Sequence, residues 1–368
     1  MKLNIRERLG RFRIRVMDYF DENPRVRKML TITAIIATLV VLIGSGIYSY
    51  SLKGFLDRTI LSTVDGLALS MLLFLMVSGF FLIFGLCDVI NFAHGAFFML
   101  GGFMGYVIYL GAEGVLLNLG IFGPSSYFLL SIIAFIVSAI GATLVLAIIG
   151  GGIEFFTIRR LYGNVIAQIL LTVGFMVIIT QVAELIWGSP VTTRYIITDS
   201  QIDYFFVSGV LDFGGILLFY VYRIFLIFLG LGIAAVMFIA FRKTRIGLQI
   251  QAGIEDSEMV EALGTNIKRL FTVVFMLGAG LAGLSGAVLV PWIGANTGHG
   301  LTYLIFAFVI VVVGGAHYGR FEGTFFGSLI VGFAMKFTAY FIPELEGVIV
   351  FIIMAVILIL KPGGLTGT

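Results

Sequence analysis

The sequence contains few charged residues, one cysteine and three histidines among its 368 residues. Charged residues make up 12% of the chain, about half the share that is usual in soluble globular domains. A soluble enzyme of this length needs a larger charged surface, so that class of protein is excluded. Cys87 forms no disulfide by itself, and His94, His299 and His317 lie too far apart for metal-ligand spacing. We therefore expect no metal or other cofactor bound by this chain.

Three common catalytic signatures are also absent. The chain has no Gly-x-x-x-x-Gly-Lys-Ser/Thr loop for nucleotide phosphates, no His-Glu-x-x-His metal motif and no Gly-x-Ser-x-Gly nucleophile turn. This pattern predicts a protein that is not an enzyme. Any work driven by ATP would be done by another subunit.

Hydrophobic residues are abundant, at 60% of the chain, together with 47 glycines. A run of about 20 apolar residues crosses about 30 Å of hydrocarbon, and ten such runs predict an all-α, polytopic transmembrane helical bundle. The runs cover residues 30–50, 60–84, 92–110, 126–150, 165–187, 219–241, 270–290, 301–315, 324–341 and 348–360. The third, eighth and tenth runs are short or interrupted by glycine, which is typical of broken or re-entrant helices.

The positive charges indicate an orientation. Nine Lys and Arg residues fall in the first 28 positions, against four acids. Ten crossings that start from a cytoplasmic N-terminus place most of the 23 basic residues inside and leave both termini cytoplasmic. Residues 1–29 are predicted to be a basic cytoplasmic segment and residues 30–55 an additional membrane anchor. The basic segment is interpreted as a topology determinant on anionic lipid, and no nucleic-acid partner is expected.

A polar cluster lies between two apolar runs. Asp88, Asn91 and His94 are spaced three residues apart, which would place them on one face of a helix. Polar groups at membrane depth are functional candidates, although the same residues could cap a helix end in headgroup water. Glu184 and Lys336 stand isolated in other runs, and we expect no charged pairs within the spans.

Small residues recur at a spacing of four positions within the runs, which is typical of closely packed membrane helices. The pattern leaves open whether they pack helices within one chain, form a dimer seam or line a pathway. The candidates for helix packing are Gly101, Gly105, Gly283, Gly315, Gly323 and Gly327.

The segment 242–269 is a long polar loop with a helix signal of its own. Asp256 or Ser257 is placed to cap a helix that continues to Leu263, and Gly264 is placed to end it. Met259, Ala262 and Leu263 share a small apolar face. Such a helix could dock a soluble partner, or it could lie on the membrane surface without one.

Several motifs together resemble the branched-chain amino acid ABC importer permeases, over roughly residues 61–365. They are Asn91-Phe92-Ala93-His94-Gly95, the loop 247–268, the glycine-rich run 278–286, Gly314-Gly315 with Gly323 and Gly327, and Lys361-Pro362-Gly363-Gly364-Leu365. The first of these is similar to the LivH-type subunit. The resemblance implies a permease domain at 56–365 with a cytoplasmic coupling loop at 242–269. Ala96 stands where many relatives have an acid, and the N-terminal anchor is not typical of the family.

The resemblance implies a transporter of the prokaryotic cytoplasmic (inner) membrane that works by alternating access. A second related permease or a second copy would pair with this chain, two cytoplasmic ABC ATPases would bind ATP and Mg²⁺, and an extracytoplasmic binding protein would deliver branched-chain or related amino acids. The implied pathway or gate residues are Asn91, Phe92, His94 and Gly95. The implied coupling helix contains Glu255, Asp256, Glu258, Met259, Glu261, Leu263 and Gly264.

Two alternatives stay open. A permease of the same family could carry urea, short amides or another small polar solute, because a shared fold does not settle the cargo. A self-sufficient secondary carrier or channel would instead need its own coupling charges.

Overall fold

The structure is a computed structural model that describes residues 52–87, 89–119, 127–188, 210–212, 218–255, 257–262, 264, 266–315, 321–361 and 363–365. The predicted basic segment 1–29 and residues 30–51 of the predicted anchor lie outside these ranges. So do Asp88, Asp256, Leu263 and His317.

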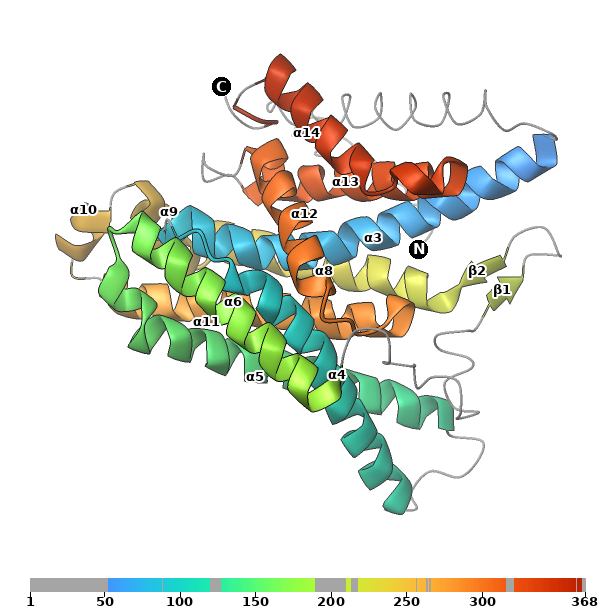
Figure 1. The fold of residues 1–368 in the computed structure, drawn as a ribbon, viewed down its shortest axis with the longest axis horizontal. Helices are drawn as coiled ribbons and strands as arrows, with labels where there is room; N and C mark the ends of the chain where they lie inside the picture. The colour runs from blue at the N-terminus through green and yellow to red at the C-terminus, as the bar shows by residue number, and fades with distance from the viewer. Residues whose placement is uncertain are drawn as a thin grey trace, which may run out of the picture.

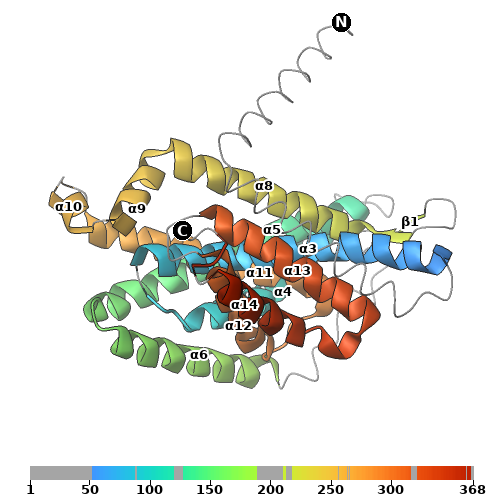
Figure 2. The same cartoon turned by 90° about the horizontal axis from the view of Figure 1, so that it is seen from above.

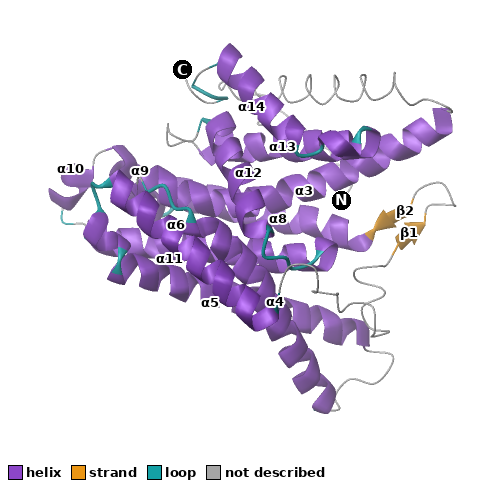
Figure 3. Cartoon of the chain, viewed as in Figure 1, coloured by secondary structure: helices purple, strands orange, loops and turns teal. Residues whose placement is uncertain are grey.

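Helices make up nearly all of the described chain (Figure 3). The α-helices are α3 (Leu52–Cys87), α4 (Ala93–Asn118), α5 (Tyr127–Phe156), α6 (Val165–Trp187), α8 (Val221–Lys243), α9 (Arg245–Glu255), α10 (Ser257–Ala262), α11 (Ile267–Ile293), α12 (His299–Gly314), α13 (Phe321–Phe341) and α14 (Val348–Leu360). Two 3₁₀ turns, η2 (Ile158–Leu161) and η5 (Pro343–Leu345), join neighbouring helices. Strands β1 (Val210–Asp212) and β2 (Leu218–Tyr220) form an antiparallel hairpin.

Seven described helices are long and apolar enough to cross a membrane, namely α3, α4, α5, α6, α8, α11 and α13. Helices α12 and α14 are apolar but shorter, with 16 and 13 residues. The prediction of a polytopic helical membrane protein is confirmed, and the hairpin is an addition that the apolar runs did not indicate. The predicted first span lies outside the described residues, so the total of ten stays a prediction.

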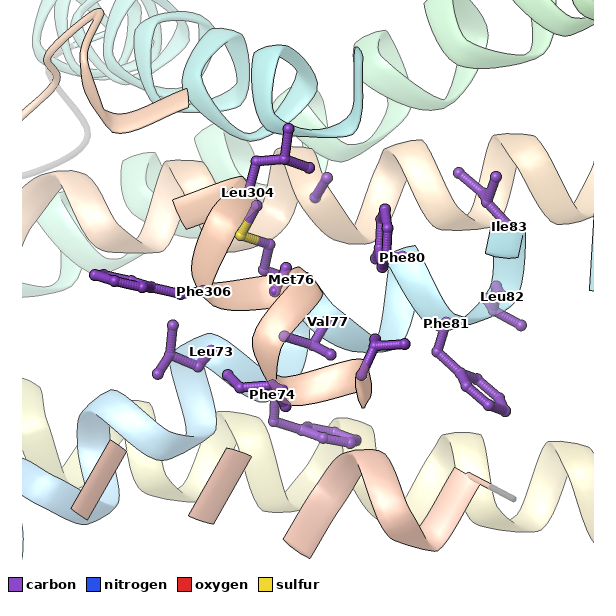
Figure 4. Close-up of a cluster of buried hydrophobic side chains, with 14 of the residues drawn as sticks. Leu73, Phe74, Met76, Val77, Phe80, Phe81, Leu82, Ile83, Leu304 and Phe306 are labelled. Carbon is purple, nitrogen blue, oxygen red and sulfur yellow. The ribbon is translucent and has the colours of Figure 1, made fainter. Parts of the chain in front are cut away.

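Helix α3 lies in the centre of the bundle, with α6 and α8 on opposite outer faces (Figures 1 and 2). The most apolar stretch of α3 is 89% buried, whereas those of α6 and α8 are 11% and 17% buried. Apolarity alone does not select the central helix, because lipid tails are as apolar as a protein interior. Figure 4 shows the side chains of α3, including Phe74, Met76 and Phe80, packed beside Leu304 and Phe306 of α12.

Helix α4 narrows one prediction. The glycines of residues 92–110 left a broken or re-entrant helix open, but α4 continues without interruption for 26 residues. A Cβ atom on Gly101 would overlap the backbone of Gly283, and one on Gly105 would overlap Ala287. The glycines therefore allow close approach to α11 and do not interrupt the helix.

This packing gives a test with a matched control in one helix. Gly101→Ala is expected to destabilise the protein by about 1–3 kcal/mol, because the added methyl group meets the rigid backbone of α11. Gly111→Ala meets no atom within 4 Å and is expected to be neutral or to stabilise by up to about 1 kcal/mol through helix propensity. Thermal unfolding of the purified protein in detergent measures both, and equal shifts would contradict the close contact.

Candidate functional site

Helices α9 and α10 extend beyond one end of the long helices, which we name the loop end (Figure 1). The chain enters them from α8 and leaves them into α11, so any force on α9 or α10 acts directly on two spans. The β1–β2 hairpin lies at the opposite end (Figure 1). The sequence predicted one helix in this loop, which corresponds to α10. The structure has a second helix there, α9, that was not predicted.

Two buried side chains attach these helices to the bundle. Ile250 of α9 is 4% exposed and Val260 of α10 is 6% exposed, and both belong to the same core cluster as Phe241. Gly247 lies so close to Phe241 that a Cβ atom would overlap its backbone. The α9–α10 unit is therefore packed against the spans and does not hang free.

The outer surface of the same unit is exposed. Met259 is 60% exposed and Leu248 is 56% exposed, and Glu261 and Ala262 are also exposed. Gly264 has φ of +90°, as expected for the left-handed residue that ends a helix. Of the other predicted coupling residues, Glu255 is the last residue of α9 and Glu258 lies in α10.

Glu154 forms a buried polar cluster at the loop end that the sequence did not indicate. Its fully buried carboxylate accepts hydrogen bonds from Arg159 Nε and Nη2 at 3.2 Å, from the Tyr162 hydroxyl at 3.0 Å and from the Thr272 hydroxyl at 2.7 Å. Arg159 Nη2 also donates to the carbonyl of Lys268 at 3.2 Å. The cluster joins the end of α5, the η2 turn and the start of α11.

The Tyr162 hydroxyl stays a donor in this cluster. Burial raises the pKa of its phenol well above the ordinary value, and the nearby Glu154 carboxylate raises it further. The phenol is therefore protonated at neutral pH, so it satisfies one of the oxygens of the buried carboxylate.

Asn91 and His94 lie deep in the protein, where the non-helical residues before α4 pass between helices. Both side chains have an exposed fraction of 0%. His94 Nε2 is 3.0 Å from the Met76 carbonyl and its ring lies edge-on to Phe80, but Nδ1 has no hydrogen-bond partner among the described residues. Neither Oδ1 nor Nδ2 of Asn91 has a partner there either.

The other two predicted gate residues lie beside this pair. Phe92 is half-buried and precedes the first residue of α4, and a Cβ atom on Gly95 would overlap the carbonyl of Gly300 in α12. The structure therefore brings Asn91, Phe92, His94 and Gly95 together where α4 meets α3 and α12.

The remaining packing candidates have separate contacts. Gly323 meets Gly314 and Gly327 meets Ile310, where α12 packs on α13. Gly315 is a left-handed helix end, with φ of +72°, and Gly364 packs against it.

The expectation that the spans lack charged pairs is wrong. Besides the Glu154–Arg159 pair, Arg223 Nη1 of α8 contacts Asp65 Oδ1 of α3. Lys336, which the sequence indicated as isolated, donates to Glu346 at 2.7 Å. Asp65 and Arg223 lie in different spans, so their pairing follows from the tertiary fold.

A cavity of about 340 Å³ lies near the end of α11 that is remote from α10. The Lys336–Glu346 pair forms its charged wall, and its other walls are mainly apolar and aromatic, including Leu289, Trp292, Tyr303 and Met335. This combination suits a small ligand with both charged and aliphatic parts.

The family described as branched-chain amino acid transport system, permease component, matches residues 62–358. The chain belongs to this family. It is therefore a multi-pass membrane permease component and not a catalytic subunit. The match begins after the predicted anchor and includes the Asn91–Gly95 segment, α9, α10 and the cavity.

Curated relatives of this permease cover most of its length. The high-affinity branched-chain amino acid transport system permease protein BraD of Pseudomonas aeruginosa is 27% identical over 83% of this chain and 94% of its own. LivH of Escherichia coli, with the same description, is 26% identical over 82% of this chain and 94% of its own. A probable LivH of Methanocaldococcus jannaschii is 23% identical, covering 81% and 89%. No solved structure shows significant similarity to the chain.

Proposed function

We propose that this permease imports branched-chain or related amino acids across the prokaryotic cytoplasmic membrane, by alternating access driven by separate ATPases. The observation that carries the proposal is the exposed α9–α10 unit, which is anchored in the core by Ile250 and Val260 and continuous with α8 and α11. A push on this unit would change the packing of two spans, and packed helices switch between discrete arrangements. The family membership supports the cargo.

The family description, which makes the chain one component of a transport system, supports the proposed partners. Two cytoplasmic ABC ATPases would hold ATP and Mg²⁺ and contact the exposed residues of α9 and α10. A second related permease or a second copy of this chain would complete the pathway, and an extracytoplasmic binding protein would deliver the amino acid.

The basic residues support a cytoplasmic loop end. Arg159 and Arg160 of η2, Arg242 and Lys243 of α8, and Lys268 and Arg269 of α11 all lie in elements at that end. Positive residues are retained on the cytoplasmic side of the membrane. In this orientation the cavity beside Trp292 faces the outer half of the membrane.

The proposed function is tested by uptake into proteoliposomes that contain the complete complex and its binding protein. We expect uptake of radiolabelled leucine that requires ATP and both ATPases. Uptake of urea without leucine would assign the alternative cargo. Leucine uptake by this chain alone, without ATP, would instead identify a secondary carrier or channel.

Asn91 and His94 are proposed as part of the gate, and Asn91 gives the sharper test. Asn91→Leu removes a buried amide that has no partner among the described residues. Because a buried polar group without a partner costs about 1–3 kcal/mol of desolvation, its removal should not lower the stability of the folded protein. We expect the Asn91 amide to form a hydrogen bond with the substrate, or with another part of the chain in the second transport conformation. Leucine uptake should then fall about tenfold in Asn91→Leu, which corresponds to one lost hydrogen bond.

Asn118→Leu, at the exposed C-terminal end of α4, is the matched control and should leave uptake unchanged. Normal uptake by Asn91→Leu would remove this side chain from the transport mechanism. A large loss of thermal stability would show that its role is structural.

A further inference from the structure

The cavity near the end of α11 joins two kinds of surface in one small space. Lys336 Nζ and Glu346 Oε1 lie 2.7 Å apart at its wall, with 21% and 34% of their side chains exposed. Leu69, Leu289 and Met335, all at most 5% exposed, form an aliphatic surface beside them. Volumes of about 300 Å³ and above are typical of small-molecule sites.

The ion pair keeps unused hydrogen-bonding capacity. An ammonium group has three donors and a carboxylate has about four acceptor positions, and the described residues engage one donor of Lys336 and one oxygen of Glu346. Lys336 Nζ also lies 5.7 Å from the centroid of the Trp292 ring. A ligand carrying one positive and one negative group can therefore bind alongside the pair without breaking it, as an alternating set of four charges.

The inner wall of the cavity leads toward the Asn91–His94 cluster. The ring of Tyr303 lies 5.7 Å from that of His299 and 4.7 Å from that of Phe98, measured between centroids. Phe98 is one helical turn from His94 on α4, so the two side chains share a face. Tyr303 and Phe98 thus link the cavity wall to the face of α4 that carries His94.

The geometry points to this cavity as a binding site for a zwitterionic amino acid with an aliphatic side chain. Lys336 would bind the α-carboxylate, Glu346 the α-ammonium group, and Leu69, Leu289 and Met335 the aliphatic side chain. The inference rests on the proposed function, since it assigns that transporter an entry site for its substrate. It adds the residues that select for both charges of the amino acid.

Thiol protection tests the site without requiring transport. Thr302 lines the cavity and is exposed, so Thr302→Cys in a Cys87→Ala background introduces a single thiol at this wall. We expect leucine to slow modification of the thiol by a small methanethiosulfonate reagent in the complete complex. Leucinamide, which lacks the carboxylate, and 4-methylpentanoate, which lacks the ammonium group, should each protect at least about tenfold less well.

The charged residues are then changed one at a time. Lys336→Met and Glu346→Gln should each raise the half-protecting concentration of leucine about tenfold, and Lys336→Arg, which keeps the charge, should raise it less. Glu344→Gln changes an exposed acid two positions from Glu346 that does not line the cavity. This control should leave protection unchanged.

The outcomes separate this site from the proposed function. Normal ATP-driven leucine uptake without protection, or with equal protection in the Lys336→Met and Glu346→Gln variants, would overturn the site and leave the function standing. Equal protection by leucine, leucinamide and 4-methylpentanoate would also overturn it. Protection by leucine without ATP-driven uptake would support the site and contradict the importer.

Discussion

Uptake driven by ATP is expected to fall about 30-fold or more when Met259→Asp and Glu261→Lys are combined. Both residues are exposed on α10, and Met259 is the large apolar side chain there, at 60% exposed. Replacing an exposed apolar anchor and reversing a second exposed charge at a docking surface can each cost about 2 kcal/mol. Co-purification of the ATPases with the permease measures the association directly.

The fold should survive this double change, because Val260, the buried residue between the two positions, is retained. The matched control makes the same two kinds of change on η5, where both positions are exposed. Glu344→Lys reverses an acidic charge and Leu345→Asp replaces an apolar side chain. That variant should keep its ATPases. Normal association and uptake in the α10 variant would show that α10 lies on the membrane surface without a partner.

Loss of the Glu154 carboxylate is expected to cause the largest loss of stability. Glu154→Ala leaves the Arg159 guanidinium and the Thr272 and Tyr162 hydroxyls without their shared acceptor. Breaking a buried ion pair costs about 3–5 kcal/mol. We expect the lower end of that range, because Arg159 is 22% exposed and keeps its hydrogen bond to the Lys268 carbonyl. The midpoint of unfolding in detergent and the yield of monodisperse protein both measure the effect.

Two comparison variants define the origin of that loss. Glu154→Gln keeps one acceptor oxygen and should be intermediate. Glu322→Ala breaks the pair with Arg242, whose side chains are 27% and 47% exposed, and should cost about 0–1 kcal/mol. If Glu154→Ala were no more harmful than Glu322→Ala, the cluster would not hold α5, η2 and α11 together.

The helix in the loop shows how much of the site could be predicted. Ser257 and the residues to Ala262 form a helix, and Gly264 has the left-handed conformation, both as the local residue types indicated. Helix α9 was missed because Thr244 alone separates it from α8, although Ile246, Ile250 and Ile254 recur at the four-residue spacing of a helix face.

The sequence by itself determined the class of the protein and the positions of its apolar helices. A run of about 20 apolar residues can be recognised locally in the sequence. In lipid such a run forms a helix, because a helix satisfies its own backbone hydrogen bonds. For that reason nine of the ten predicted runs, all those within the described residues, correspond to apolar helices.

Only the tertiary structure decided which polar residues meet. Asp65 and Arg223 lie 158 positions apart, and Glu154 and Thr272 lie 118 positions apart. No local spacing can reveal such pairs, because they depend on which helix faces pack together. The cavity beside Lys336 has the same origin, since its walls come from α3, α11, α12, α13 and the residues before α14.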